Sequence, residues 1–441
     1  MNKKLFTAAI IASLGGLLFG FDTAVISGAE QSIKEVYNLD GFWHGFTNSI
    51  ALIGTIIGAM FCGRPADKFG RRNTLIVLAL FYVISAIGCA LAGSWFSLLF
   101  FRFLGGLGVG ASSVIGPMYI SEIAPAKLRG RLVAVFQFNI VFGILVAFFS
   151  NYLLNKIITE DVWRFMLGVE AVPALIFFMT LFFIPKSPRW LILNNEESQA
   201  KKVIIDLGVK DVELLLSDIK KSLASTNSTI KEHLFSRKFR FPLLLAFLFA
   251  TFNQFTGINA IMYYAPRIFE MTGLAKDTAL FQVVIIGLTN MLFTIIAMFF
   301  IDKFGRKTLM MIGSLGMIIS LSLTAYSFYY QDFTGYSVLI YLICFIAFFA
   351  FSQGAVIWVF LSEVFPNSVR AKGQAFGSLT HWVWAAILTW TFPVVAELES
   401  GGFYAFAFFA LAMVLQLVFV VKIMPETKGK SLEELENVVL K

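Results

Sequence analysis

Long apolar runs alternate with short polar segments along nearly the whole chain. About twelve of these runs reach the roughly 20 residues that a helix needs to cross a bilayer. The fifty phenylalanines fit a bundle of helices that are apolar on all sides. We predict spans at 5–26, 46–62, 74–91, 96–118, 132–153, 165–184, 241–264, 280–301, 309–328, 337–361, 374–395 and 403–423.

One charged segment, residues 186–240, interrupts this pattern and separates six spans from six others. Within it, 200–207 and 212–219 have apolar residues at helical spacing, which predicts a cytoplasmic linker of short amphipathic helices. A disordered tether is the alternative. The sequence therefore predicts a six-helix bundle over 1–185, the linker over 186–240, a second six-helix bundle over 241–424, and a helix-like cytoplasmic tail over 425–441.

Composition and charge placement support a membrane protein. The chain is 58% hydrophobic and only 14% charged, whereas a soluble protein carries roughly 25% charged residues. Nearly all Lys and Arg fall at the N-terminus and in every second loop, which predicts that both termini are cytoplasmic. The net charge of +8 follows from this topology and requires no nucleic-acid partner. The exceptions in the opposite loops are Lys34, Lys156, Arg164, Arg267 and Lys276.

A short charged motif occurs twice, as DKFGRR at 67–72 and as DKFGRK at 302–307. A second pair of motifs repeats in the same order: Glu122, Pro125 and Arg129 follow one apolar run, and Glu363, Pro366 and Arg370 follow another. Two membrane halves with the same loop motifs indicate an internal duplication, which is how many secondary transporters are built.

Further motifs carry a family resemblance: PKSPRWL at 185–191, NQFTGIN at 253–259 and PETKGKSLEELE at 425–436. Together with the paired DKFGR motifs, they make the chain resemble the sugar porters of the major facilitator superfamily, most of all bacterial proton-coupled pentose and hexose symporters. The resemblance implies an all-α integral membrane protein of the inner (plasma) membrane, with twelve transmembrane helices in two pseudo-symmetric six-helix bundles. It also implies a monomer that imports a monosaccharide with a proton by alternating access.

Asp22 and Arg102 stand out because each lies within a predicted span. A charge there is costly, so we expect both to face a cavity or each other. Gly16 and Gly20 on the first helix, and Gly106 and Gly110 on the same face of the fourth as Arg102, leave room for these two helices to approach. Arg keeps its proton and Asp can take one up, so separating the two would favour proton uptake by Asp22. In the family, proton-coupled members have Asp at this place. A static ion pair between two helices is the alternative.

Polar side chains within the spans are candidates to bind a sugar where the two halves meet. Amides suit hydroxyl groups because each can donate and accept, and aromatic faces suit the C–H faces of a pyranose. For each amide the alternative is a hydrogen bond between helices. The candidates are Gln137, Asn253, Gln254, Asn259, Tyr263, Asn290, Gly354, Trp358, His381 and Trp382. The resemblance favours Gln137, Gln254, Asn259 and Trp358 most.

Gln254 and Asn259 lie about 140° apart on an ideal helix, so they do not share a face. We expect local unwinding at Gly257 to let both point inward. His381 is expected to be neutral and to bond a sugar hydroxyl, with titration near neutral pH as the alternative.

The chain departs from the family at a few places, which leaves the identity of the sugar open. Asn253 stands where the family often has Gln, Gln353 and Ala355 where the similar symporters have Trp and Pro, His381 where they have Gln, and Lys186 where the family usually has Glu.

The charged motifs at the cytoplasmic ends of the helices are expected to form a gate, because a network that forms in one state and breaks in another biases the equilibrium between them. The alternative is that they only fix topology. The gate residues are Asp67, Arg71, Arg72, Glu122 and Arg129 in the first half, Asp302, Arg306, Lys307, Glu363 and Arg370 in the second, and Glu170, which matches a family acidic position near the cytoplasmic side.

Two other functions stay open. In a sugar uniporter, Asp22 and Arg102 would be structural; a membrane sugar sensor would bind without transport, although sensors of this shape usually carry longer tails. An enzyme is not expected, because no nucleophile–base arrangement, phosphate loop or metal-ligand cluster occurs in the spans. We expect no cofactor and no metal; the expected partners are the sugar, the proton and the lipid bilayer.

Overall fold

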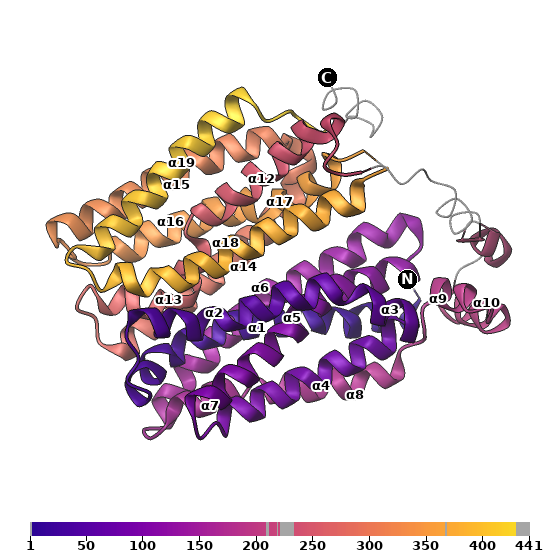
Figure 1. The fold of residues 1–441 in the computed structure, drawn as a ribbon, viewed down its shortest axis with the longest axis horizontal. Coiled ribbons are helices and arrows are strands. Elements are labelled where there is room, and N and C mark those ends of the chain that lie inside the picture. The colour runs from indigo at the N-terminus through magenta and orange to yellow at the C-terminus, as the bar shows by residue number, and fades with distance from the viewer. Residues whose placement is uncertain (1, 209–210, 218, 221–232, 367, 429–441) are drawn as a thin grey trace. The chain divides into compact units, whose positions relative to one another are not determined.

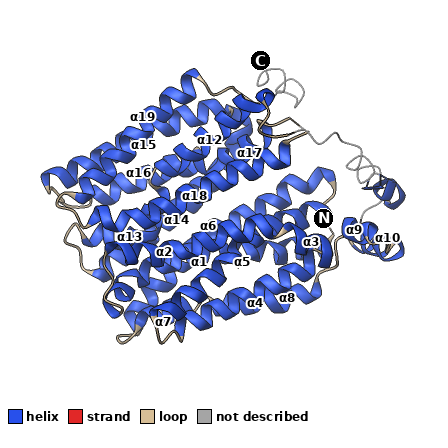
Figure 2. Cartoon of the chain, in the orientation of Figure 1, coloured by secondary structure: helices blue, strands red, loops and turns tan. Residues whose placement is uncertain are grey.

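The structure is a computed structural model that describes residues 2–208, 211–217, 219–220, 233–366 and 368–428. Over these residues it consists of helices and connecting loops (Figure 2), and twelve helical segments are long and apolar enough to cross a membrane. Each predicted span lies largely within one of these segments. The prediction of an all-α membrane fold is therefore confirmed. The predicted tail helix at 431–436 lies outside the described residues.

Six spans precede the linker. They are formed by α1 (Lys3–Val36), α2 (Gly41–Phe61), α4 (Arg71–Ala90), α5 (Trp95–Ile123), α6 (Ala126–Ile157), and the broken helix of α7 (Val162–Gly168), α8 (Ala171–Thr180) and the 3-10 turn η1 (Leu181–Phe183). A short helix, α3 (Gly63–Phe69), joins α2 to α4 and ends at Gly70.

The other six spans follow the linker. They are formed by η2 (Arg237–Phe239) with α12 (Arg240–Phe255) and α13 (Ile258–Glu270), then α14 (Lys276–Phe304), α15 (Arg306–Tyr330), α16 (Ser337–Phe351) with α17 (Gln353–Glu363), α18 (Arg370–Ala396) and α19 (Gly401–Lys422). Figure 1 shows α15 and α19 side by side, and they make extensive contact.

Two of these spans are broken near their middle. Between α12 and α13, Gly257 has a φ of +83°, a left-handed conformation that glycine adopts without steric cost. The expected unwinding at Gly257 is therefore present. Between α16 and α17, Ser352 leaves helical geometry, and its hydroxyl donates to the Phe348 carbonyl at 2.6 Å.

The chain forms two compact units. The first comprises Met1–Thr23, Ile53–Ala147 and Arg164–Ile230; the second comprises Ala24–Leu52, Phe148–Trp163 and Lys231–Lys441. The second unit thus includes residues from α1, α2 and α6, which are anchored there by contacts such as Asn48 Nδ2 to Tyr264 Oη (3.0 Å). The bundle boundaries predicted at 185, 240 and 424 stay a prediction.

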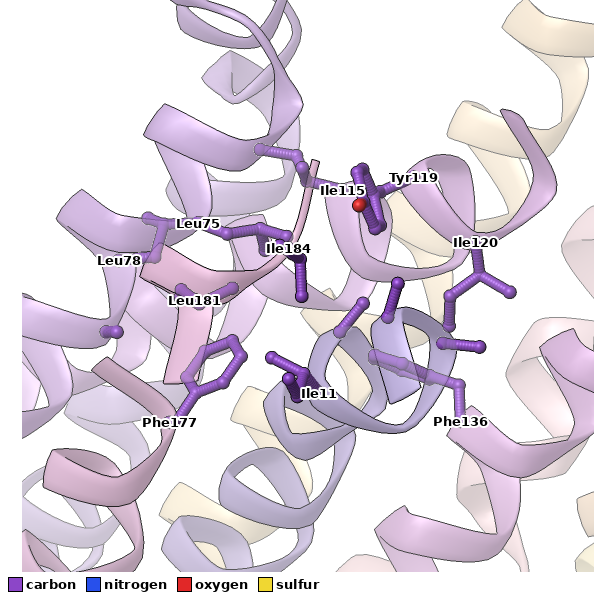
Figure 3. Packing of buried hydrophobic residues seen from close by; sticks show 14 of the residues in the cluster. Ile11, Leu75, Leu78, Ile115, Tyr119, Ile120, Phe136, Phe177, Leu181 and Ile184 are labelled. Carbon is purple, nitrogen blue, oxygen red and sulfur yellow. The ribbon is translucent and has the colours of Figure 1, made fainter. Parts of the chain in front are cut away.

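The core of the first unit is built from α1, α4, α5, α6 and α8 (Figure 3). Close backbone approach between α1 and α6 sets its packing: a Cβ on Gly20 would lie 1.9 Å from the Ile140 carbonyl oxygen, and one on Gly143 would lie 2.1 Å from that of Leu17. Gly16 and Gly20 therefore let α1 pack closely against α6, and not against the fourth span, α5, as we expected. Gly110 on α5 approaches α2 at Thr55 instead.

Short helices occur in the described part of the linker. The helices α9 (Pro188–Leu193) and α10 (Glu197–Asp206) enclose a small core that includes Trp190, Leu191 and Ile204. The start of α1 contacts the end of α10, where Lys4 Nζ lies 2.8 Å from Asp206 Oδ1. The Lys4 ammonium holds the pKa of Asp206 below its usual value.

Candidate functional site

The most deeply buried charges of the first unit are Asp22 on α1 and Arg102 on α5. Arg102 Nη1 donates to Asp22 Oδ1 at 2.7 Å, and both residues are almost fully buried. Gly105, one turn after Arg102, keeps this place open, since a Cβ there would approach Ser85 Oγ to 2.4 Å and Asp22 Oδ1 to 3.7 Å. The structure therefore brings the two predicted residues together as an ion pair in a dry site.

A third charge, Glu170, belongs to this site. It lies in the break between α7 and α8, is buried, and interacts electrostatically with both Asp22 and Arg102. Its Oε1 has no hydrogen-bond partner among the described residues. We grouped Glu170 with the charges at the cytoplasmic helix ends, and this grouping stays a prediction; in the structure its electrostatic interactions include the buried pair. Two carboxylates and one guanidinium carry a net charge of −1. One proton on either carboxylate makes the group neutral.

In the second unit, several predicted sugar-site residues meet around the break between α12 and α13. Asn253 and Gln254 end α12, and Asn259 lies in the first turn of α13. Asn259 Nδ2 donates to Gln254 Oε1 at 2.6 Å, and Gln254 Nε2 donates to Asn253 Oδ1 at 3.0 Å. The turn at Gly257 makes this possible, because it replaces the helical geometry that would keep Gln254 and Asn259 on different faces.

Aromatic rings adjoin these amides. Gln254 Nε2 lies 3.1 Å from Nδ1 of His381 on α18. The ring of His381 packs against Trp382 and against Trp358 of α17, with centroid distances of 4.8 and 5.1 Å. Trp358 keeps 39% of its surface accessible, whereas His381 keeps 8%. An accessible indole that packs against a ring bonded to a buried amide is the kind of arrangement expected of a sugar site.

The remaining sugar-site candidates lie on other elements. Tyr263 on α13 and Asn290 on α14 are buried, and Gly354 begins α17 beside the Phe349 ring. Gln137 lies half-buried on α6, in the first unit.

The charged motifs of the first half form a connected network at one end of the first unit. Arg71 on α4 donates from Nε to Glu122 Oε1 at 3.0 Å and from Nη1 to Asp67 Oδ1 at 3.1 Å. Ser187, which caps α9, donates to the other oxygen of Glu122 at 2.5 Å. Arg72 donates instead to the Leu181 and Phe182 carbonyls, which are free because η1 ends the span there.

The second half repeats this network on α15 and α17. Arg306 Nη2 donates to Glu363 Oε1 at 2.9 Å, and Thr427 Oγ1 donates to Glu363 Oε2 at 2.6 Å. Thr427 thus takes the place of Ser187, each two residues after a proline, Pro425 or Pro185. The duplicated sequence produces duplicated contacts.

The two networks differ at one residue. Glu426 accepts from the backbone N–H groups of Arg306 and Lys307, each at 3.0 Å, and so caps α15. Its counterpart is Lys186, which follows Pro185 and cannot accept a hydrogen bond. Lys186 lies 4.0 Å from Glu196 and over the ring of Trp190, which packs on Gly70. The Lys186 departure therefore removes a carboxylate from the start of α4.

Among the described side chains, two predicted gate residues, Arg129 and Arg370, take no part in the bonds around Glu122 and Glu363. Arg129 is exposed near the start of α6 and takes no part in the network of the first half. Arg370 begins α18 and donates to the Phe365 carbonyl at 3.2 Å. The side chain of Asp302 lies outside the described set.

The sequence analysis missed a buried pair in the second unit. Glu30 Oε2 on α1 lies 2.5 Å from His44 Nε2 on α2, and both side chains are fully buried, although the angles are not those of a hydrogen bond. The His44 ring packs edge-on against Tyr264, whose hydroxyl donates to the Thr389 carbonyl. The signal was present, since both residues are ionisable and lie in or beside an apolar run.

This chain is similar to known proteins over nearly its whole length. A family model described as "Sugar (and other) transporter" matches residues 8–439. The chain is 37% identical to the D-xylose-proton symporter of Escherichia coli K12, over 99% of this chain and 96% of that protein. It is 39% identical to the arabinose-proton symporter of Bacillus subtilis, over 98% and 94% of the two chains.

Solved structures agree. The inward open conformation of the xylose transporter XylE from Escherichia coli matches with a TM-score of 0.88 at 36% identity, over 99% of this chain and 100% of that one. XylE of the major facilitator superfamily bound to 6-bromo-6-deoxy-D-glucose matches with a TM-score of 0.77 at 35% identity, over 99% of each chain. The chain therefore belongs to the sugar transporter family of the major facilitator superfamily.

Proposed function

We propose that this chain carries a monosaccharide, a pentose or a hexose, into the cell together with a proton, by alternating access. The observation that carries the proposal is the buried pair of Asp22 and Arg102, with which the buried Glu170 interacts electrostatically. A structural ion pair needs only one carboxylate for one guanidinium. Because Glu170 supplies a second carboxyl group, Asp22 can take up a proton while Arg102 keeps an anionic partner. The names of the relatives, symporters of xylose and arabinose with protons, support the same function.

The coupling follows from charge balance. With Asp22 ionised, Arg102 is neutralised and the two helices α1 and α5 are joined. A proton on Asp22 weakens that bond and leaves the guanidinium to Glu170, so protonation and helix separation favour each other. A proton that enters from one face in one conformation and leaves to the other face in the next is thereby transported.

The sugar is held by the amides of Asn253, Gln254 and Asn259 with the rings of Trp358 and His381. Amides exchange hydrogen bonds with hydroxyl groups, and the accessible indole covers a C–H face. Gln137, Tyr263, Asn290, Gly354 and Trp382 complete the proposed set. The charged networks around Glu122 and Glu363 bias the conformational equilibrium and act as the cytoplasmic gate.

The proposed orientation places both termini in the cytoplasm of a bacterial cell, since Lys and Arg gather on that face. The protein works as a monomer in this proposal, because one chain carries both the buried ion pair and the amides around Gly257.

Uptake into proteoliposomes tests the function. Purified protein is reconstituted, and uptake of labelled xylose, arabinose, glucose and other pentoses and hexoses is followed with and without an inward proton gradient. We expect one sugar to accumulate above its external concentration only when the gradient is present. Equilibration of a sugar without any response to the gradient would identify a uniporter, and binding without uptake would identify a sensor.

A further inference from the structure

A chain of side-chain hydrogen bonds runs away from the sugar-site amides into the second unit. Asn253 Nδ2, whose oxygen receives Gln254, donates to Gln353 Oε1 of α17 at 3.1 Å. Gln353 Nε2 donates to Gln416 Oε1 of α19. Gln416 Nε2 donates to Ser314 Oγ of α15 at 2.7 Å. We call these residues the amide relay: Asn259, Gln254, Asn253, Gln353, Gln416 and Ser314.

The relay has one direction. From Asn259 to Gln416, every amide donates through its nitrogen toward Ser314 and accepts through its oxygen from the previous residue. The far end sets this direction. The only proton of the Ser314 hydroxyl goes to the Met310 carbonyl at 2.7 Å, so Ser314 Oγ can only accept from Gln416. Gln416 must then turn its oxygen to Gln353, and in the same way each amide fixes the orientation of the next one along the relay.

Burial makes the direction costly to reverse. Gln353, Gln416 and Ser314 have no accessible surface, and Asn253 and Gln254 keep 1%. Rotating one amide by half a turn would bring two N–H groups face to face on one side and two oxygens on the other. Buried polar groups without partners are destabilising, and hydrogen bonds in a chain strengthen one another. The relay therefore holds a single set of orientations.

The open end of the relay is Asn259, its one part-accessible member. Asn259 uses one of its two N–H bonds on Gln254, so it presents Oδ1 as an acceptor and keeps its second N–H as a donor. Gln254 uses its two N–H bonds on Asn253 and His381, and so keeps a lone pair on Oε1. This end of the site offers acceptors to the sugar.

We propose that Gln353 and Gln416 are positioning residues that select the sugar without touching it. Through the amide relay they fix which way the Asn259 and Gln254 amides face, so that a sugar hydroxyl bound at their oxygens is one that donates. This inference rests on the proposed function, because it requires that the amides around Gly257 bind a sugar. Burying two glutamines on the apolar helices α17 and α19 costs free energy of desolvation. A role in positioning the sugar-site amides gives a reason for their presence there.

The test compares two serines of α15. Ser314→Ala removes the acceptor at the far end of the relay, and Gln416→Leu removes its next member. Ser320→Ala is the matched control, since Ser320 is also buried and also donates to a carbonyl four residues earlier, Gly316, at 2.6 Å, but lies outside the relay. Dissociation constants are measured for the best of D-xylose, L-arabinose and D-glucose and for each of its mono-deoxy analogues.

We expect Ser314→Ala and Gln416→Leu to reduce discrimination against one deoxy analogue, the one that lacks the hydroxyl bound by Asn259, by about tenfold. The other analogues and the Ser320→Ala protein should keep their wild-type ratios. A double-mutant cycle adds a second readout: in an Asn259→Ala background, Ser314→Ala should no longer change affinity. Unchanged ratios for the other analogues in the Ser314→Ala protein exclude a folding artefact.

Two results would overturn the proposal. One is an equal loss of affinity for every sugar in Ser314→Ala, and the other is additive effects of Asn259→Ala and Ser314→Ala. Failure of the proposed function gives a different result, since the wild-type protein would then bind none of the three sugars.

Discussion

At the scale of single residues, Asp22 is the carboxyl group on which the proposed coupling depends. Asn at this position has nearly the shape of the protonated acid but exchanges no proton. We expect Asp22→Asn to abolish accumulation driven by a proton gradient while sugar exchange across the membrane continues. The measurement is gradient-driven uptake and counterflow of the same labelled sugar in proteoliposomes.

Asp206→Asn is the matched control for that change, because Asp206 is an exposed aspartate in the linker whose pKa is lowered by Lys4. It should leave both activities unchanged. Undiminished accumulation in the Asp22→Asn protein would show that another group carries the proton.

His381 is the second residue with a sharp expected effect. Its ring contacts Gln254, Trp358 and Trp382, so a change there alters the hydrogen bonds offered to the sugar. A made hydrogen bond contributes about 0.5–1.5 kcal/mol, and an unpaired buried group costs about 1–3 kcal/mol. His381→Gln should therefore change the relative affinities of pentoses and hexoses by a factor between several-fold and about a hundredfold.

Competition of unlabelled sugars against the best substrate measures this ranking. His233→Gln, at an exposed position of the linker, is the control and should not alter it. If His381→Gln changes every competitor by one common factor, the ring only packs, and does not select.

The residue scale also shows what a sequence can predict about a site. Asn253, Gln254 and Asn259 were found because amides within an apolar run are conspicuous. Gln353 and Gln416 are equally polar, but their role depends on Ser314, a hydroxyl on a different helix. Buried serines commonly bond their own helix backbone, so nothing local marked Ser314 as the end of a relay.

At the scale of helices, the difference between Lys186 and Glu426 has a measurable consequence. Glu426 caps α15, while α4 has Lys186 in the corresponding place. Lys186→Glu should give α4 the cap that α15 has and raise the free energy of unfolding by about 0.5–2 kcal/mol. Lys186→Gln, which removes the positive charge without supplying a carboxylate, is the control. Thermal unfolding in detergent compares the variants, and equal stability of Glu and Gln would contradict the capping role.

The buried pair of Glu30 and His44 joins α1 to α2. Removing one partner leaves the other buried without its polar neighbour, and an unpaired buried polar group costs about 1–3 kcal/mol, whereas replacing both by apolar residues is often nearly neutral. We expect His44→Leu to destabilise the protein strongly and Glu30→Leu combined with His44→Leu to recover most of the loss. Unfolding transitions of the three proteins decide the matter; a double variant no more stable than the single one would show that packing, not charge, matters there.

Helix positions were predictable from run length, because a bilayer fixes how long an apolar helix must be. One helix break was also predictable, at Gly257, where two polar residues could not otherwise share a face. The break at Ser352 and the one beside Glu170 were not, since each depends on contacts made after the helices pack. For the same reason the glycines of α1 were correctly read as a close-packing surface but assigned to the wrong neighbour.

At the scale of the whole molecule, the internal duplication explains why the same chemistry occurs twice. Arg71 with Glu122 and Arg306 with Glu363 occupy equivalent helices, and Ser187 and Thr427 complete them with a hydroxyl. The sequence repeat predicted these charge pairs. It did not predict that the second compact unit includes parts of α1, α2 and α6, because that grouping arises from contacts such as Asn48 to Tyr264 between distant segments.

The duplicated networks should control the rate of transport and not the affinity for sugar. Glu122 and Glu363 bond residues at the helix ends, and neither bonds the amides around Gly257 in the described contacts. Glu122→Gln or Glu363→Gln weakens contacts that belong to this conformation, so the population shifts toward the other state and the cycle slows. We expect turnover to fall by about tenfold, which corresponds to about 1.4 kcal/mol, with the dissociation constant nearly unchanged. Glu399→Gln, in an exposed loop, is the control. An affinity loss as large as the loss in turnover would mean that these networks support the binding site itself.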